Sequence, residues 1–173
     1  MPFEIVRNDI TQMRVDAIVN TANPRPVIGA GTDAMVHRAA GPELLLARQR
    51  IGSIAAGDAA LTPAYALNAK YVIHTVGPVW DGGSYGEETL LRKCYDNSLQ
   101  LALEHGCRSI AFPLISSGAY GYPKDKAMKV AINAISSFLF ENDFDEDPLV
   151  YIVAYNKDAV AAGKKVFSKR TLS

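Results

Sequence analysis

Hydrophobic positions along this chain follow two alternating periods, one typical of strands and one typical of helices. Short apolar or alternating runs predict β-strands over Phe3–Arg7, Ala17–Val19, Ala59–Thr62, Lys70–Val76, Ser109–Phe112 and Leu149–Tyr155. Apolar residues at helical spacing predict helices over Thr32–Ala40, Pro42–Arg50, Glu87–His105, Lys124–Glu141 and Lys157–Phe167. Because strands and helices alternate, we expect an α/β fold with a mainly parallel sheet covered on both faces.

The overall composition narrows the class of protein. A length of 173 residues predicts a single domain spanning residues 1–173. No apolar run approaches membrane-spanning length and the first four residues lack signal-peptide character, so we expect a cytoplasmic protein with no membrane partner. The formal net charge is zero, which argues against a general nucleic-acid binder. It does not exclude an anionic small ligand, because backbone N–H groups can hold phosphate without lysines.

The residues that most often bind metals are scattered along the chain. Cys94 and Cys107 are the only cysteines, and neither belongs to a C-x-x-C motif. The three histidines, His37, His74 and His105, form no ligand cluster with them. We therefore expect no metal and no cofactor, and two buried thiols in a reducing compartment.

The segment after the second predicted strand carries polar residues that a core does not need. Asn20 and Asn23 follow the apolar strand, and then come the small residues of Gly29–Gly31 and the carboxylate of Asp33. Each asparagine either caps the backbone of the loop or binds a ligand, and the amide of Asn23 suits the vicinal diol of a sugar. Asp33 either interacts favourably with the dipole of the helix that begins beside it, or orients or deprotonates a water molecule.

A second loop, over residues 113–123, combines small residues with a following helix. Such a loop lets backbone N–H groups approach an anion, although a plain strand-to-helix turn explains the same pattern. It contains neither a P-loop nor a Rossmann fingerprint. Ser116 and Ser117 lack the G-x-S-x-G elbow of a serine hydrolase.

Two further strand ends offer candidate contacts for a nucleotide base. Asp9 follows the first strand, where it either accepts a hydrogen bond from an exocyclic amine or caps a turn. Tyr155 ends the last strand, where it either stacks on a base or belongs to the core.

Together these segments resemble a macro domain. The matching residues are 8–11, 16–23, 29–41, 71–78, 110–113 and 117–123. The resemblance implies a three-layer α/β/α sandwich around a mixed, mostly parallel sheet. It also implies that ADP-ribose binds in a cleft at the carboxyl ends of the strands, and that the partners are ADP-ribose and ADP-ribosylated proteins.

Carried over by motif, the resemblance implies a site residue by residue. Asp9 and Ile10 would contact adenine, Tyr155 would pack on it, the loop from Ser117 to Tyr120 would wrap the diphosphate, and Asn23 with Gly29–Gly31 would hold the distal ribose. The full predicted set of ligand-binding residues is Asp9, Ile10, Asn20, Asn23, Gly29, Ala30, Gly31, Thr32, Ser116, Ser117, Gly118, Ala119, Tyr120, Tyr155 and Asn156. Asp33 and Asn23 are the predicted catalytic residues.

The segment over residues 29–37 is most similar to the MacroD-type branch of the family. In that branch the aspartate matching Asp33 supports hydrolysis of ADP-ribosyl esters, on acidic protein side chains and in O-acetyl-ADP-ribose. A non-catalytic ADP-ribose reader and a phosphatase acting on ADP-ribose 1″-phosphate are the alternatives.

Three departures from the branch pattern bear on the rate. Ala30 replaces one of four usual consecutive glycines and adds a Cβ where we expect the backbone to need a positive φ. The usual Val-Asp-Gly becomes Thr32-Asp33-Ala34, and the prolines of residues 24–26 stiffen the loop after Asn23. On this basis Ala30 favours the reader and Asp33 favours the enzyme.

Overall fold

A six-stranded sheet forms the centre of the protein. The computed structural model describes residues 3–172, with side chains as far as residue 166. The strands are β1 (Phe3–Arg7), β2 (Ala17–Thr21), β3 (Ala59–Pro63), β4 (Tyr71–Thr75), β5 (Ser109–Pro113) and β6 (Leu149–Ala154). Their order is β1-β6-β5-β2-β4-β3, and every neighbouring pair is parallel except β3 and β4. The predicted mixed, mostly parallel sheet is confirmed.

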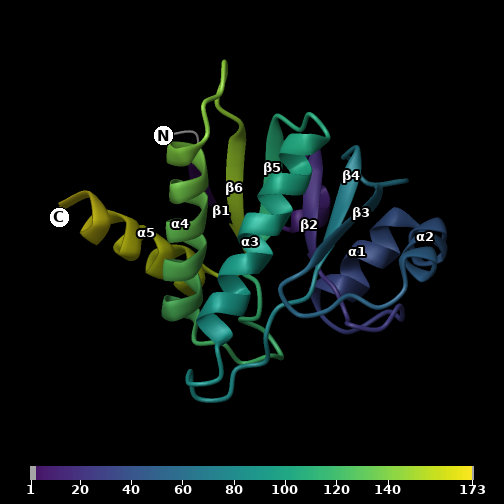
Figure 1. Cartoon of the computed structure of the whole chain (residues 1–173), viewed down its shortest axis with the longest axis horizontal. Coiled ribbons are helices and arrows are strands. Elements are labelled where there is room, and N and C mark those ends of the chain that lie inside the picture. Colours follow the sequence, from purple (N-terminus) through teal and green to yellow (C-terminus); the bar gives the residue numbers. More distant parts are fainter. Residues whose placement is uncertain (1–2, 173) are drawn as a thin grey trace.

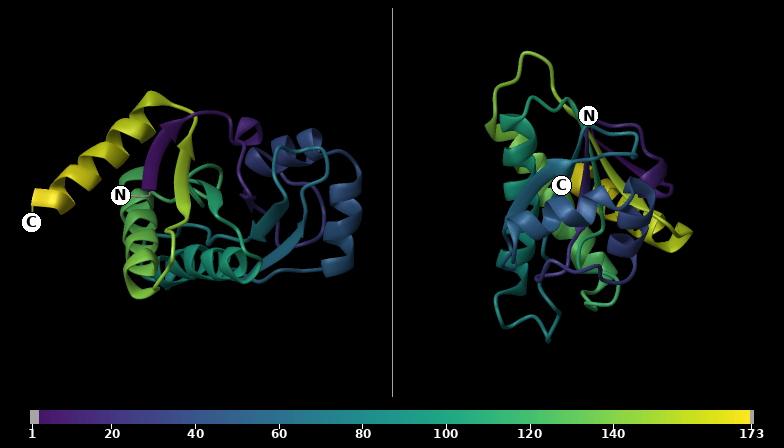
Figure 2. Two further views of the ribbon diagram at one scale, coloured as in Figure 1. Left: turned by 90° about the horizontal axis from the view of Figure 1, so that it is seen from above. Right: turned by 90° about the vertical axis from the view of Figure 1, so that its right-hand side faces the viewer.

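Helices cover both faces of this sheet. They are η1 (Ile10–Gln12), α1 (Thr32–Ala40), α2 (Glu43–Ile51), α3 (Glu87–Glu104), α4 (Lys124–Glu141) and α5 (Lys157–Leu172). The helices α3 and α4 lie on one face, and η1, α1 and α2 lie on the other (Figures 1 and 2). The helix α5 packs beside β1 and α4, where Gly163 allows close approach to Ile5. The arrangement is the expected three-layer sandwich.

Alternation along the strands divides the core into two parts. In β2, Ala17 and Val19 pack in the cluster under α3 and α4, whereas Ile18 packs in the cluster under α1 and α2. All three side chains are fully buried, as are Leu91 of α3 and Ile132 of α4. Burying one such leucine or isoleucine contributes about 1.5–3 kcal/mol, so the apolar pattern that predicted the elements also holds them together.

The observed elements differ from the predicted ones mainly at their ends. The strand β2 continues two residues past Val19, so Asn20 lies inside the sheet and not in the loop that follows. The strand β6 stops at Ala154, which leaves Tyr155 outside it, and α5 continues to Leu172. The short helix η1 was not predicted. Among the described residues, no helix is both long enough and apolar enough to cross a membrane.

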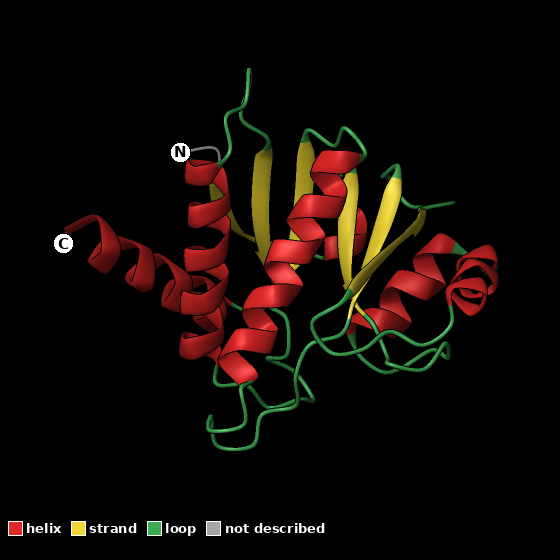
Figure 3. Cartoon of the chain, in the orientation of Figure 1, coloured by secondary structure: helices red, strands yellow, loops and turns green. Residues whose placement is uncertain are grey.

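The parallel arrangement determines where a ligand site can form. The strands β1, β2, β5 and β6 all run in the same direction, so their carboxyl ends meet along one edge of the sheet (Figure 3). The loops that leave those ends are the ones that carry the polar residues singled out in the sequence. In open α/β sheets ligands bind along such an edge.

Candidate functional site

A cleft of about 420 Å³ lies at this edge, in the size range of ligand pockets. Its lining includes most of the residues expected from the sequence. The predicted residues that line it are Ile10, Asn23, Gly29, Ala30, Gly31, Thr32, Asp33, Ser116, Ser117, Gly118, Ala119, Tyr120, Tyr155 and Asn156. Segments more than a hundred residues apart in the sequence therefore share one cavity, whereas Asp9 and Asn20 do not line it.

Asp33 is held rigidly in the first turn of α1. Its side chain is 3% exposed, Oδ1 accepts a hydrogen bond from Asn20 Nδ2 at 2.7 Å, and Oδ2 accepts one from the Gly29 N–H at 2.7 Å. The Nε2 atom of His37 lies 3.5 Å from Oδ1. Burial alone would raise the pKa of this carboxyl, but the contacts with His37, Gly29 and Asn20 lower it below the ordinary value. Asp33 is therefore ionised at neutral pH and is fixed in orientation.

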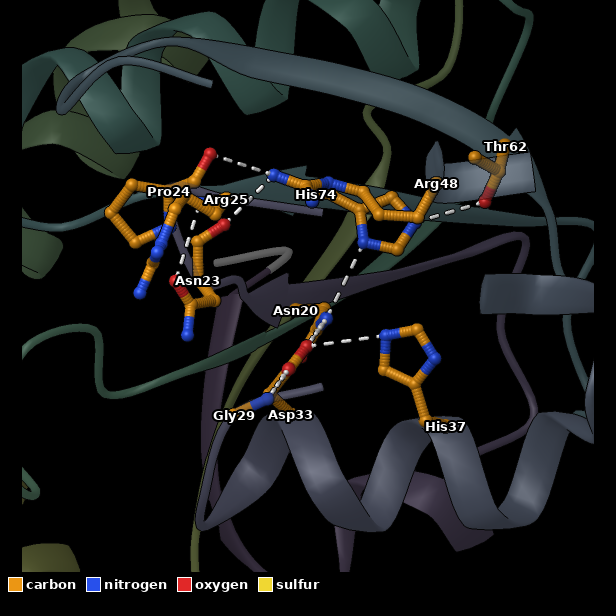
Figure 4. Close-up of polar contacts among 10 residues, drawn as sticks. All are labelled: Asn20, Asn23, Pro24, Arg25, Gly29, Asp33, His37, Arg48, Thr62 and His74. Carbon is orange, nitrogen blue, oxygen red and sulfur yellow. Dashed lines mark hydrogen bonds and ion pairs between the residues drawn. The ribbon is translucent and has the colours of Figure 1, made fainter. Parts of the chain in front are cut away.

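Asn20 supports this carboxylate from behind and does not face the cleft. It is fully buried on β2, and its Nδ2 donates to Asp33 Oδ1 and lies 3.4 Å from Nδ1 of His74 (Figure 4). The extension of β2 through residue 21 turns the side chain into the protein. The expectation that Asn20 contacts a ligand thus finds no support in its position, and its amide instead orients Asp33.

His74 continues this set of contacts into the sheet. Its Nε2 lies 3.0 Å from the hydroxyl of Thr62, which donates to the Pro63 carbonyl at 3.1 Å. The hydroxyl hydrogen is thereby used, so Nε2 carries the proton and Nδ1 accepts from Asn20. Burial lowers the pKa of His74 to about 3, and Coulombic interactions with Arg48 and His37 act in the same direction. A neutral imidazole therefore keeps the Asn20 amide in one orientation.

Asn23 lies near the start of the loop between β2 and α1 and lines the cleft. Its Oδ1 accepts from the Arg25 N–H at 3.2 Å, which is the capping role considered from the sequence. Its Nδ2 donates to no acceptor in the described part of the chain. This atom lies near Gly29, because a Cβ added to Gly29 would lie 3.5 Å from it. The side chain therefore caps the loop with one atom and leaves the other available to a ligand.

The glycine-bearing loop departs from the expectation at Ala30. Gly31, the residue immediately before α1, has a φ of +62°, and among the described residues the non-glycines with positive φ are Tyr65 and Ser116. Ala30 is not among them. The predicted strain at Ala30 was wrong, because the left-handed conformation falls one residue later, at a glycine.

The loop after β5 lines the cleft and contains unused backbone donors. Within the described residues, the N–H groups of Gly118, Ala119 and Tyr120 donate to no acceptor. The loop is braced by the Ser117 hydroxyl, which donates to the Leu114 carbonyl at 2.7 Å, and by the Tyr120 carbonyl, which accepts from Trp80 at 2.8 Å. Successive free N–H groups in a braced loop form a site suited to an anion.

Ser116 begins this loop in an unusual conformation. Its φ is +66°, and its buried Oγ has no hydrogen-bond partner among the described residues. The side chain packs directly over Gly77, where any Cβ would overlap Ser116 Oγ. Residue 77 is therefore a glycine because Ser116 occupies the space that a side chain would need.

Ile10 and Tyr155 also line the cleft. Tyr155 is 48% exposed, and its hydroxyl lies 3.2 Å from Asp9 Oδ1. Burial and the negative charge of Asp9 raise the pKa of Tyr155 to about 12. Asp9 Oδ1 also accepts hydrogen bonds from the N–H and hydroxyl of Thr11, at 2.9 and 2.7 Å. Asp9 therefore caps η1, which is the capping role considered from the sequence.

Sequence reasoning missed several residues of the cleft. They are Thr21, Ala22, Gly77, Pro113, Leu114, Lys124, Val153, Ala154 and Ala159. Lys124 is the one lysine or arginine among the described residues that line the cleft, and it forms no ion pair there. A cation in the first turn of a helix is unfavourable for the helix dipole, and that local misfit was the signal that could have identified it.

The cleft is thus suited to a polar organic anion as its ligand, and the carboxylate of Asp33 lines it. In the described part of the chain, no three His, Cys, Asp or Glu side chains lie close enough together to hold a metal ion. The N–H donors of the loop after β5 suit phosphate oxygens, and the free amide of Asn23 suits a hydroxyl.

Comparisons with known proteins agree with this geometry. The model of the macro domain family matches residues 19–131. A macro domain-containing protein of Methanosarcina mazei is 48% identical over 167 residues, covering 96% of this chain and 88% of that protein. An O-acetyl-ADP-ribose deacetylase of Citrobacter koseri is 46% identical over 172 residues, covering 97% and 96%. The crystal structure of the Trypanosoma brucei macrodomain in complex with ADP-ribose superposes with a TM-score of 0.88 at 38% identity, covering 94% of this chain and 68% of that one.

Proposed function

The chain belongs to the macro domain family, and from this premise we propose that its cleft binds ADP-ribose and hydrolyses ADP-ribosyl esters. The substrates are O-acetyl-ADP-ribose and proteins mono-ADP-ribosylated on aspartate or glutamate. The observation that carries the proposal is the pairing, in one cleft, of unused backbone N–H groups with the fixed, ionised carboxylate of Asp33. The relatives described as O-acetyl-ADP-ribose deacetylases, and the ADP-ribose complex of a structural neighbour, support it.

The cleft offers a place for each part of the ligand. Adenine lies between Ile10 and Tyr155. Asp9 lies outside the lining but contacts the Tyr155 hydroxyl through Oδ1, and its Oδ2 is the acceptor for the exocyclic amine. The diphosphate lies on the N–H groups of residues 118–120, and Lys124 adds a positive charge to the same side of the cleft. Asn23 and the loop over residues 29–31 hold the distal ribose.

The state of Asp33 decides which catalytic role suits it. A carboxylate with a lowered pKa is a poor proton acceptor, so Asp33 acts mainly by holding water in place. Its Oδ2 accepts one hydrogen bond, from the Gly29 N–H, and retains room for a second, whereas Oδ1 accepts from Asn20 and faces His37. A water molecule that donates to Asp33 is thereby oriented toward the ester on the distal ribose.

A turnover assay with O-acetyl-ADP-ribose tests this function. Asp33→Ala and Asp33→Asn should lower kcat by about 10²- to 10⁴-fold, the usual contribution of a positioned acid or base, while the Kd for ADP-ribose changes less than about threefold. Asp143→Ala, in an exposed loop far along the chain, is the matched control and should leave both values unchanged.

The products distinguish the proposal from its alternatives. Release of ADP-ribose and acetate by the wild-type protein is the expected result. Binding without any product indicates a reader, and phosphate release from ADP-ribose 1″-phosphate alone indicates a phosphatase. Equal turnover by the wild-type and Asp33 variants would refute the role of Asp33.

The thiols support a proposal about the cellular setting. Cys94 and Cys107 are free and buried, as expected in a reducing compartment, so we propose a cytoplasmic protein that acts on ADP-ribosylated protein partners. We also propose that residues 1–173 form one domain.

A further inference from the structure

Arg48, on α2, is a buried cation that forms no ion pair among the described residues, although the charge of Asp33 acts on it at longer range. Its side chain is 2% exposed. Its Nη2 donates to the carbonyls of Asn23 at 2.8 Å and Pro24 at 3.3 Å, and its Nε has no partner in the described part of the chain (Figure 4). Arginine is almost never fully buried unless it is paired, so its placement calls for a reason beyond packing.

The two carbonyls that Arg48 holds belong to the turn that places Asn23 in the cleft. The Pro24 carbonyl also accepts from the Ile54 N–H at 2.8 Å, so the turn is attached from behind to α2 and to the segment after it. The far end of the same loop is fixed by the hydrogen bond between Gly29 and Asp33. Arg48 itself does not line the cleft and can affect a ligand only through this turn.

The hydrogen-bond acceptors of Arg48 are neutral carbonyls, and the charge of Asp33 only partly offsets the cost of burying the positive charge, because the pKa of Arg48 remains below its ordinary value. A hydrogen bond to a carbonyl could come from an uncharged side chain, whereas desolvating a guanidinium costs several kcal/mol. Two features of the arginine side chain explain its use here. Its length spans the gap from α2 to the turn, and its rigid, planar group fixes the direction of the bonds that it donates.

We propose that Arg48 is a positioning residue for the distal ribose, which holds the Asn23–Pro24 turn so that Nδ2 of Asn23 points into the cleft. This inference rests on the proposed function, because it assigns a part of the ligand to Asn23. We therefore expect the affinity for ADP-ribose, which has a distal ribose, to depend on Arg48. The affinity for ADP, which lacks this ribose, should not depend on it.

Titration calorimetry with ADP-ribose and with ADP tests this preference on four variants. Arg48→Met removes both the charge and the donors, Arg48→Gln keeps a neutral donor, and Arg48→Lys keeps the charge with a point donor. Arg50→Met, two residues away on the exposed side of α2, is the control. Thermal melts of every variant report whether the fold is intact.

The expected result is a selective loss. Arg48→Met weakens ADP-ribose about tenfold, the effect of about one hydrogen bond, and weakens ADP less than twofold. With O-acetyl-ADP-ribose its KM rises and its kcat falls, because a misplaced ribose both binds and reacts less well. Arg48→Lys or Arg48→Gln recovers part of the loss, and Arg50→Met behaves as wild type.

Other outcomes overturn the inference. The inference is wrong if Arg48→Met binds ADP-ribose with unchanged affinity. It is also wrong if the variant loses the same affinity for ADP and for ADP-ribose, because Arg48 would then have only a structural role. If Arg48→Met does not fold, the same comparison between the lysine and glutamine variants and the wild-type protein decides. Wild-type protein that binds neither nucleotide would instead refute the proposed function itself.

Discussion

Replacing Asn20 by alanine separates the residues that hold Asp33 from those that touch a ligand. The side chain is fully buried behind the cleft, and its Nδ2 donates to the ionised Asp33 at 2.7 Å. Asn20→Ala removes this donor, so that Oδ1 of Asp33 keeps only its longer contact with His37 Nε2 at 3.5 Å. It also leaves Nδ1 of His74 without its neighbour at 3.4 Å.

The size of the effect follows from these contacts. A hydrogen bond to a charged group contributes about 1.5–3 kcal/mol, and the orphaned acceptor on His74 and the small cavity add to the loss. We expect the free energy of unfolding to fall by about 2–4 kcal/mol, which lowers the melting temperature by roughly 5–12 °C for a chain of this length. A carboxylate displaced by about 1 Å costs up to about 10²-fold in rate, so kcat should fall by about 10- to 100-fold.

Thermal melts, turnover of O-acetyl-ADP-ribose and titration with ADP-ribose measure the three quantities separately. Asn97→Ala is the matched control, because its Nδ2 donates to the neutral Gly57 carbonyl at 2.7 Å away from the cleft. It should cost about 0.5–1.5 kcal/mol and leave kcat unchanged. Asn20→Ala should keep the Kd for ADP-ribose within about threefold. A loss of affinity as large as the loss of kcat would refute the reasoning and place Asn20 in contact with the ligand.

Two further predictions concern the glycine-bearing loop and the buried histidine. Ala30→Gly should leave kcat within about twofold and lower stability by about 0.4–1 kcal/mol, because the positive φ is at Gly31 and no strain is relieved; a large gain in turnover would contradict this. His74 is neutral in the folded protein, with its pKa held at about 3, and takes up a proton on unfolding below its ordinary value of 6.5. The stability that it contributes is thus complete at about pH 8 and is lost as the pH falls toward 3, by about 2 kcal/mol between about pH 8 and about pH 5. Urea midpoints at these two pH values should differ less in His74→Gln, and equal differences in both proteins would exclude the buried neutral histidine.

The sequence by itself determined the order and type of the helices and strands, and most of the residues around the cleft. The continuous apolar run of β2 and the helical spacing of apolar residues in α3 and α4 are local signals, because the run marks a strand buried on both faces and the spacing places apolar residues on one face of each helix. The loops that leave parallel strands also meet at one edge whatever their sequence separation. Asn23, Asp33 and the loop after β5 could therefore be expected to lie together.

Only the tertiary structure decided what stands behind the cleft. Asn20 lies in the sheet because β2 runs two residues further than its apolar stretch, and pairing with β4 sets that length. Arg48 gave one weak local signal, its position four residues after the buried Leu44 on the same side of α2. Its carbonyl partners at Asn23 and Pro24 lie more than twenty residues earlier in the chain. The partners of a buried polar residue cannot be identified from the sequence alone, because they are brought together only when the layers pack and exclude water.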